Sequence, residues 1–299
     1  MKLLVADVRG GEVRPVLEKS DQTRLGRGFY ESHLLQPDAI AHTARAVAEF
    51  AAMAAGLGST PPRVIGTSAA RDARNAAELA AAILQASGLA LEVITGEQEA
   101  EFAYRGVSSD SALAGLPLLI LDVGGGSTEF IVGHGPERRF AQSFGIGSVR
   151  LLEQFPLGDP PCAAELAACR RHVRAFLERE VRASLDPALA AVRVGGELSL
   201  IGTGGATTIL ARMEQRMEDF DRAHIEATRL SRGRVVEWND RLWSLPFAER
   251  RALPGLPPKR ADVILFGAAI YEGVMECFGL AELRVSTRGL RFGALLAQS

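Results

Sequence analysis

Cysteine, long apolar runs and an excess of either charge are all scarce in this chain of 299 residues. Its three cysteines leave an odd count and form no CxxC pair, which argues against a disulfide framework and against a structural zinc site. Because Cys162 and Cys169 share one alanine-rich stretch, we expect both on the buried face of a helix. The formal net charge is only −2, so we expect no broad basic surface for DNA or RNA, and any polyanion must be held by a local pocket.

Membrane and export signals are also missing from the sequence. No apolar run reaches the roughly 18 residues that suggest a membrane span. The first residues, 1–7, contain no long apolar region followed by a cleavage site. With 47% hydrophobic and 23% charged residues, the composition is that of a globular protein, and we expect it to be cytoplasmic and not to bind membranes.

The order of apolar runs and helical patterns predicts an α/β fold. Stretches in which apolar residues recur every three or four positions separate the apolar runs, as expected where sheets are at least partly parallel. The length suggests two domains, which we place at 1–117 and 118–299, with the last helix returning to the first domain. The predicted strands are 2–8, 64–65, 91–94, 117–123 and 198–202, and the predicted helices are 38–55, 72–87, 163–183 and 261–278.

Three glycines follow the predicted strand at 117–123. Without side chains to shield them, the backbone N–H groups of residues 124–127 can converge on a phosphate oxygen, and the hydroxyls of Ser127 and Thr128 would add donors. The alternative is an ordinary tight hairpin, since paired glycines are also a turn signal. Asp122 and Glu129 flank the turn, and acids beside phosphate are unfavourable unless a divalent cation lies between.

A second glycine turn, at 202–205, follows the predicted strand at 198–202. Because a helical pattern begins there, Gly204 and Gly205 offer a second anion site at a helix N-terminus. By itself this pattern is a weak signal. The glycines of the segment 286–293 are weaker still, because they can simply end a strand and admit the last helix.

Acidic and basic residues at two strand-to-helix junctions leave two interpretations open. Thr95 and Gln98 have the spacing of a capping box at the start of a helix. The neighbouring Glu99 either complements the helix dipole or accepts a proton from an attacking water. Arg71, after the strand at 64–65, either clamps a phosphate or is simply solvated.

Six motifs follow one another along nearly the whole chain: Gly66-Thr-Ser-Ala-x-Arg71-x-Ala-x-Asn75, Thr95-Gly-x-x-Glu99-Ala, Asp122-x-Gly-Gly-Gly-Ser-Thr-Glu129, Gly202-Thr-Gly-Gly, Pro258-x-Arg260-Ala-Asp262 and Gly289-Leu-Arg291. This ordered set resembles the exopolyphosphatase/guanosine pentaphosphate phosphatase family. The resemblance implies two actin-like domains, of the ribonuclease H-like, sugar-kinase type, around a cleft. It also implies release of terminal orthophosphate from inorganic polyphosphate or guanosine pentaphosphate. We expect these substrates and a second copy of the chain, in a homodimer, as partners.

The same resemblance implies roles for individual residues. Glu99 would be the catalytic base that deprotonates the attacking water, although Gln98 stands where the family has a first acid. Asp122 and Glu129 correspond to the acids placed around water and metal, which we expect to be Mg²⁺ or Mn²⁺. A second departure is Phe292, where the family often has glutamate. The residues expected to contact substrate phosphate are Arg71, Gly124, Gly125, Gly126, Ser127, Gly204 and Gly205.

Two other functions stay open at this point. An ATP-dependent kinase of the same fold would need an adenosine pocket and an acceptor site, and the sequence has no positive sign of either. A sensor that binds guanosine penta- or tetraphosphate without hydrolysing it would keep the glycine turns.

The beginning of the chain also departs from the family pattern. The family's first strand runs into an Asp-x-Gly-Ser/Thr-Asn-Ser/Thr turn, and residues 3–7 look like the strand after that turn. We therefore expect the first domain to lack one strand and one phosphate-facing loop. Either the start codon is internal to a longer gene, or the protein has lost activity and become a binder.

Overall fold

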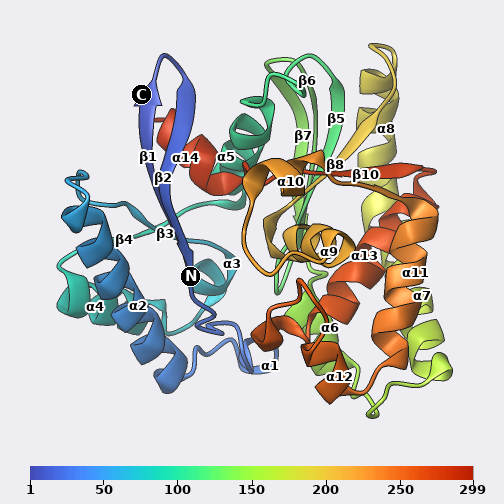
Figure 1. Ribbon diagram of the computed structural model, residues 1–299, viewed down its shortest axis with the longest axis horizontal. Coiled ribbons are helices and arrows are strands. Elements are labelled where there is room, and N and C mark those ends of the chain that lie inside the picture. The colour runs from blue at the N-terminus through green and yellow to red at the C-terminus, as the bar shows by residue number, and fades with distance from the viewer. Residues whose placement is uncertain (299) are drawn as a thin grey trace. The chain divides into compact units, whose positions relative to one another are not determined.

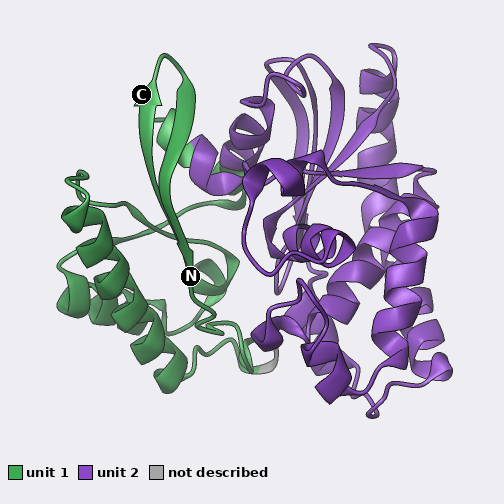
Figure 2. Ribbon diagram, in the orientation of Figure 1, with its two compact units in different colours: residues 1–99, 294–299 green, residues 100–293 purple. Residues whose placement is uncertain are grey.

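The computed structural model describes residues 1–298, except for the side chains of Tyr30 and Glu31. Within this range no helix is both long and apolar enough to cross a membrane. The chain forms two compact units, one of Met1–Glu99 with the C-terminal residues from Ala294 and one of Ala100–Gly293 (Figure 2). The domain boundary expected between residues 117 and 118 stays a prediction, whereas the compact units divide earlier, after Glu99.

The smaller unit contains two separate two-stranded sheets. β1 (Lys2–Arg9) and β2 (Glu12–Ser20) form an antiparallel hairpin, while β3 (Val64–Gly66) and β4 (Leu91–Val93) are parallel. The predicted strands at 2–8, 64–65 and 91–94 are therefore confirmed. Whether a further strand precedes residues 3–7 stays a prediction.

Helices of the smaller unit are α1 (Phe29–Ser32), α2 (Pro37–Gly56), α3 (Ser68–Asp72) and α4 (Ala76–Ser87). α2 packs against α4, and their buried apolar side chains form one core. α5 (Gly96–Ser108) starts in this unit and continues in the larger one. At the other end of the chain, α14 (Leu290–Leu296) begins in the larger unit and ends in the smaller one.

The single helix predicted at 72–87 is wrong, because the chain leaves the helical conformation after Asp72 and resumes it at Ala76. Ala73 is extended, with a ψ of 132°. The Asn75 side chain accepts the N–H of Leu35 at 2.9 Å and donates to its carbonyl at 3.0 Å. These two tertiary hydrogen bonds outweigh the helix propensity of the surrounding alanines.

A six-stranded mixed sheet lies at the centre of the larger unit, in the order β7-β6-β5-β8-β10-β9 (Figure 1). β5 is antiparallel to β6 and parallel to β8, and β8 is parallel to β10. The prediction of a partly parallel α/β fold is thereby confirmed. The bounds are β5 (Pro117–Val123), β6 (Thr128–His134), β7 (Glu137–Phe144), β8 (Ser199–Thr203), β9 (Arg229–Ser231) and β10 (Glu282–Val285).

Helices surround this sheet. The central one, α13, is buried along most of its length and packs against α7 and α11 (Figure 1). The helix predicted at 163–183 continues through a π-helical turn, η1, into α8. The bounds are α6 (Ser148–Gln154), α7 (Ala163–Phe176), η1 (Leu177–Val181), α8 (Arg182–Arg193), α9 (Gly204–Gln215), α10 (Arg222–Ala227), α11 (Arg232–Ser244), α12 (Phe247–Arg251), the 3₁₀ turn η2 (Pro258–Arg260) and α13 (Ile264–Cys277).

The two cysteines expected on one buried face have different surroundings. Cys169 is fully buried in the core, and burial raises the pKa of its thiol to about 12. Cys162 is exposed and occupies the N-cap of α7. The expectation for Cys162 is wrong because it precedes the first helical turn, where helical periodicity does not apply.

The topology brings three loops to one edge of the sheet. Because β5, β8 and β10 are parallel, their carboxyl ends lie at the same edge. The loops that leave these ends are residues 124–127, the start of α9 at Gly204, and residues 286–289. The backbone bond from Ser286 N to Gly202 O, 2.9 Å long, ties the third loop to the end of β8. In open α/β sheets this edge is where ligands bind.

Candidate active site

The first glycine turn is a hairpin loop of four residues that joins β5 to the antiparallel β6. It is closed by a hydrogen bond from Gly124 N to Ser127 O, 2.9 Å long. The hairpin interpretation is thus correct as geometry. It does not exclude anion binding, because the decisive question is where the other N–H groups of the loop point.

The carbonyls of Gly124 and Gly125 are held from one side by the start of α6. Gly124 O accepts from Ser148 N at 3.0 Å, and Gly125 O accepts from the N–H groups of Val149 and Arg150 at 2.8 and 2.9 Å. In a planar trans peptide the N–H points opposite to the C=O. The N–H groups of Gly125 and Gly126 therefore point away from α6, on the side where an anion would bind.

The hydroxyls beside the glycines are used within the protein. Ser127 Oγ donates to Glu129 Oε1 at 2.8 Å. Thr128 is fully buried, and its hydroxyl donates to Ile146 O at 2.6 Å. The expectation that Thr128 adds a donor to phosphate is therefore wrong, because as the first residue of β6 its side chain turns into the core. The loop offers backbone donors instead.

Asp122 on β5 and Glu129 on β6 face each other across the two strands of the hairpin. They are paired in the register of β5 and β6, and directly opposed side chains project from the same face of a sheet. Glu129 is only 4% exposed, and its Oε1 also accepts the hydroxyl of Ser143 at 2.7 Å. Two opposed carboxylates repel each other, and a bound cation would relieve this repulsion.

The two carboxylates of Asp122 and Glu129 fit Mg²⁺ better than a metal that demands many protein ligands. Within residues 1–298 no group of three or more His, Cys, Asp or Glu side chains could hold a metal ion. Two carboxylates, together with water and substrate phosphate, are the usual surroundings of Mg²⁺ in phosphoryl-transfer sites. Asp122 and Glu129 would supply two such hard oxygen ligands.

The second glycine turn leads directly into α9, as the sequence predicted. Gly204 has a φ of +84°, and a Cβ there would collide with Oδ1 of Asp122. Glycine at this position therefore lets the Asp122 carboxylate lie against the N-terminus of the helix. Below the turn, the fully buried Tyr271 accepts a hydrogen bond from Thr207 and contacts the carbonyls of Leu121 and Thr203 at 3.3 and 3.4 Å.

Arg260 lies beside the second glycine turn, although the phosphate contacts expected from the sequence did not include it. A Cβ placed on Gly205 would lie 3.7 Å from Nη2 of Arg260, so the guanidinium is close to the second glycine turn. The motif Pro258-x-Arg260-Ala-Asp262 was the available signal. Ser143, which holds Glu129, had no signal in the sequence because its contact depends on the register of β7 against β6.

The other predicted site residues, Arg71 and Glu99, belong to the smaller unit and contact each other. Arg71 Nη1 donates to Glu99 Oε2 at 3.3 Å and to Ile94 O at 3.0 Å. The Glu99 side chain is 14% exposed and that of Arg71 is 27% exposed, so the carboxylate is largely sheltered from water and the guanidinium partly so. Of the two open interpretations, a fully solvated Arg71 is excluded in this conformation.

The capping box at the start of α5 is confirmed. Thr95 N donates to Gln98 Oε1 at 2.9 Å, and Gln98 N donates to Thr95 Oγ1 at 3.1 Å. These reciprocal bonds fix the first turn of the helix that carries Glu99. Gln98 therefore has a structural use that a glutamate would serve equally well, because only its side-chain oxygen is needed.

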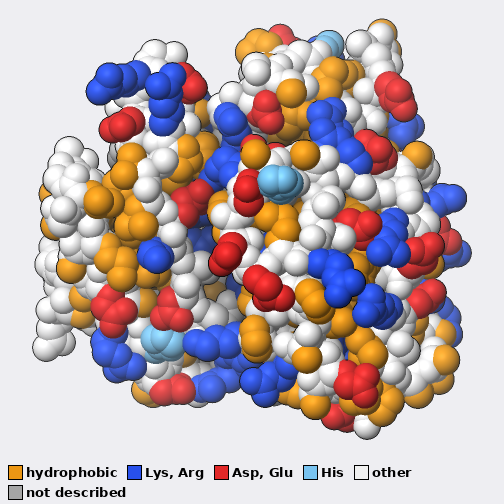
Figure 3. Space-filling model, viewed as in Figure 1, with side chains coloured by type: hydrophobic (Ala, Val, Ile, Leu, Met, Phe, Trp, Pro, Cys, Tyr) orange, Lys and Arg blue, Asp and Glu red, His pale blue; other side chains and the backbone are white. Residues whose placement is uncertain are grey.

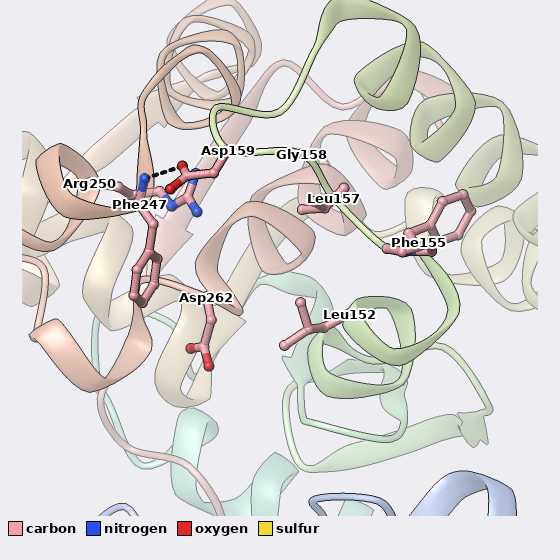
Figure 4. Close-up of a pocket in the computed structure, with 9 residues that line it drawn as sticks. Leu152, Phe155, Leu157, Gly158, Asp159, Phe247, Arg250 and Asp262 are labelled. Carbon is pink, nitrogen blue, oxygen red and sulfur yellow. Dashed lines mark hydrogen bonds between the residues drawn. The ribbon is translucent and has the colours of Figure 1, made fainter.

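A separate pocket of about 270 Å³ lies in the larger unit and contains none of the predicted site residues. Its wall includes Leu152, Phe155, Phe247, Arg250 and Asp262 (Figure 4). The bond from Phe247 N to Asp159 Oδ1, 2.6 Å long, closes one side.

Acidic and basic side chains are interspersed on the face seen in Figure 3. Whether a polyanion is held by a local pocket stays a prediction.

Comparison with known proteins identifies the group to which the chain is related. The model of the Ppx/GppA phosphatase family matches residues 4–298. The chain belongs to this family. It is 35% identical to exopolyphosphatase 2 of Mycobacterium tuberculosis, over 99% of this chain and 94% of that protein. It is 28% identical to the guanosine-5'-triphosphate,3'-diphosphate pyrophosphatase of Vibrio cholerae, over 97% of this chain and 55% of that protein.

Solved structures of Ppx/GppA proteins have the same fold. An exopolyphosphatase from Cytophaga hutchinsonii superposes with a TM-score of 0.87 at 26% identity, covering 99% of this chain and 93% of that one. The fold is therefore the actin-like type that the sequence motifs implied. As a member of the Ppx/GppA phosphatase family, the chain is a hydrolase.

Proposed function

We propose that this protein releases terminal orthophosphate from inorganic polyphosphate, from guanosine pentaphosphate, or from both. The observation that carries the proposal is the phosphate loop, residues 124–127. Its carbonyls of Gly124 and Gly125 face α6, and its N–H groups of Gly125 and Gly126 face away. Such oriented donors bind phosphate oxygens at no reorganisation cost. The relatives named exopolyphosphatase and guanosine-5'-triphosphate,3'-diphosphate pyrophosphatase support these two substrates.

In the proposed mechanism, Glu99 orients an attacking water and accepts its proton. The ion pair with Arg71 holds the Glu99 carboxylate in one position before substrate arrives. When phosphate binds, Arg71 can turn one of its remaining N–H donors to it, since a guanidinium has five.

Charge on the equatorial oxygens is stabilised by the loop donors and by the N-terminus of α9 at Gly204 and Gly205. Asp122 and Glu129 would hold Mg²⁺ or Mn²⁺, which supplies Lewis-acid stabilisation of the phosphoryl oxygens when bound. Ser127 and Ser143 orient the Glu129 carboxylate for this task. No histidine or cysteine nucleophile is required.

Orthophosphate release by the purified protein tests the proposal. We expect release from long-chain polyphosphate or from guanosine pentaphosphate in the presence of Mg²⁺, and loss of that release in the Glu99→Gln variant. Binding of either compound without any release would contradict hydrolysis and favour the sensor. Phosphate transfer from ATP to an acceptor would favour the kinase.

A further inference from the structure

One carbonyl of the phosphate loop is held by a side chain instead of the backbone of α6. Arg150 Nε donates to Gly126 O at 2.9 Å. The neighbouring carbonyls of Gly124 and Gly125 accept backbone N–H groups of residues 148–150. Arg150 therefore completes a set of bonds that runs along all three glycine carbonyls.

We propose that Arg150 is a positioning residue for the phosphate loop, an inference that rests on the proposed function. The peptide between Gly126 and Ser127 is planar, so fixing its carbonyl toward α6 turns the N–H of Ser127 to the opposite side. That N–H is thereby aligned with those of Gly125 and Gly126. Because Arg150 binds the carbonyl side of the loop, it acts through the loop and not by contact with the phosphate.

This role depends on a donor at one position of the side chain and not on its charge. In Arg150→Gln, the amide nitrogen is separated from the backbone by the same number of bonds as Arg Nε, so it can donate to Gly126 O without a charge. In Arg150→Met, a side chain of similar length has no donor. In Arg150→Lys the charge is kept, but its nitrogen lies one atom farther along.

Two measurements on the protein of residues 1–299 separate these variants. We expect kcat/KM for orthophosphate release to fall about 10-fold in the Met and Lys variants, the factor that corresponds to 1.4 kcal/mol, and to fall much less in the Gln variant. We expect amide hydrogen exchange of a peptide covering residues 118–132 to become faster by a similar factor, about 10-fold, in the Met and Lys variants. The matched control is Arg179→Met, an exposed arginine on η1, which should behave as wild type in both measurements.

The order of the variants decides the question. If Lys keeps activity and Gln loses it, the charge of Arg150 contacts substrate and positioning is overturned. Exchange at wild-type rates in all three variants would also overturn it, because the loop would then be held without Arg150. Exchange does not require turnover: if wild type releases no orthophosphate but Met and Lys still exchange faster than Gln, the proposed hydrolysis fails while the role of Arg150 in positioning the loop is supported.

Discussion

Replacing Gly204 by alanine tests how the two glycine turns are coupled. Gly204 combines a φ of +84° with a neighbouring carboxylate, because a Cβ would collide with Oδ1 of Asp122. The backbone alone costs about 1–2 kcal/mol for a residue other than glycine in this region. The collision adds a second effect, since the Asp122 carboxylate must leave its position against the start of α9.

The two effects can be separated with Gly279→Ala. Gly279 also has a positive φ, of +66°, but a Cβ there would meet nothing within 4 Å. This control therefore carries the backbone cost without displacing any functional group. Both variants should lose a similar amount of stability from the backbone, roughly 2–4 °C in melting temperature per kcal/mol for a protein of this size class.

The Gly204→Ala and Gly279→Ala variants should differ sharply in orthophosphate release. A displacement of about 1 Å in a catalytic arrangement can cost on the order of 100-fold in rate. We expect a loss of this order in kcat/KM for Gly204→Ala, together with a higher Mg²⁺ concentration for half-maximal activity, and no comparable loss for Gly279→Ala. Orthophosphate release at a temperature well below both melting points measures this. Equal activity of the two variants would refute the coupling of Asp122 to the second turn.

Three further predictions follow from single groups. Glu99→Gln should lower kcat about 10²- to 10⁴-fold with substrate binding largely intact, whereas the exposed neighbour Glu97→Gln should not; near-normal turnover in the first variant would reduce Glu99 to a helix-terminus acid. Exhaustive chelation should abolish orthophosphate release, and Mg²⁺ or Mn²⁺ should restore it; full activity after chelation would remove the metal from the mechanism. Burial acts to raise the pKa of Glu101, but hydrogen bonds from Arg105 and Arg138 outweigh this and lower it. The contribution of Glu101 to stability is therefore present above its ordinary pKa and disappears as the pH falls through the lowered value, so Glu101→Gln should be less stable than wild type near pH 7 and equal to it in strong acid. Thermal unfolding across the acidic range measures this difference, and a constant difference would contradict it.

The sequence predicts well wherever a local pattern decides the structure. β5 coincides with its predicted span because a mostly apolar run of seven residues is bounded by turn signals on both sides. The start of α5 was recognisable because a capping box needs only residues three apart. In both cases the relevant interactions lie within a few residues of one another.

Prediction from the sequence fails where contacts between residues far apart in the chain decide the structure. The interruption between α3 and α4 depends on Asn75 binding the backbone of Leu35, 40 residues away. β6 was not predicted because it is buried on both faces and lacks the alternation of a half-exposed strand. The orientation of the loop peptides depends on α6, which follows two strands later in the chain. Three glycines can only indicate that such an orientation is sterically possible.

Two of the departures from the family pattern, at Gln98 and Phe292, concern the scaffold and leave the proposed chemistry in place. Gln98 uses its side-chain oxygen to cap α5, a task for which charge is unnecessary. Phe292 is 1% exposed, and its ring lies 4.7 Å from the guanidinium of Arg222 and 6.0 Å from that of Arg288. A ring face can attract these cations where a glutamate would pair with them. Neither change removes a donor from the phosphate loop or an oxygen ligand from Asp122 and Glu129, which is why we favour a hydrolase over a sensor that has lost its chemistry.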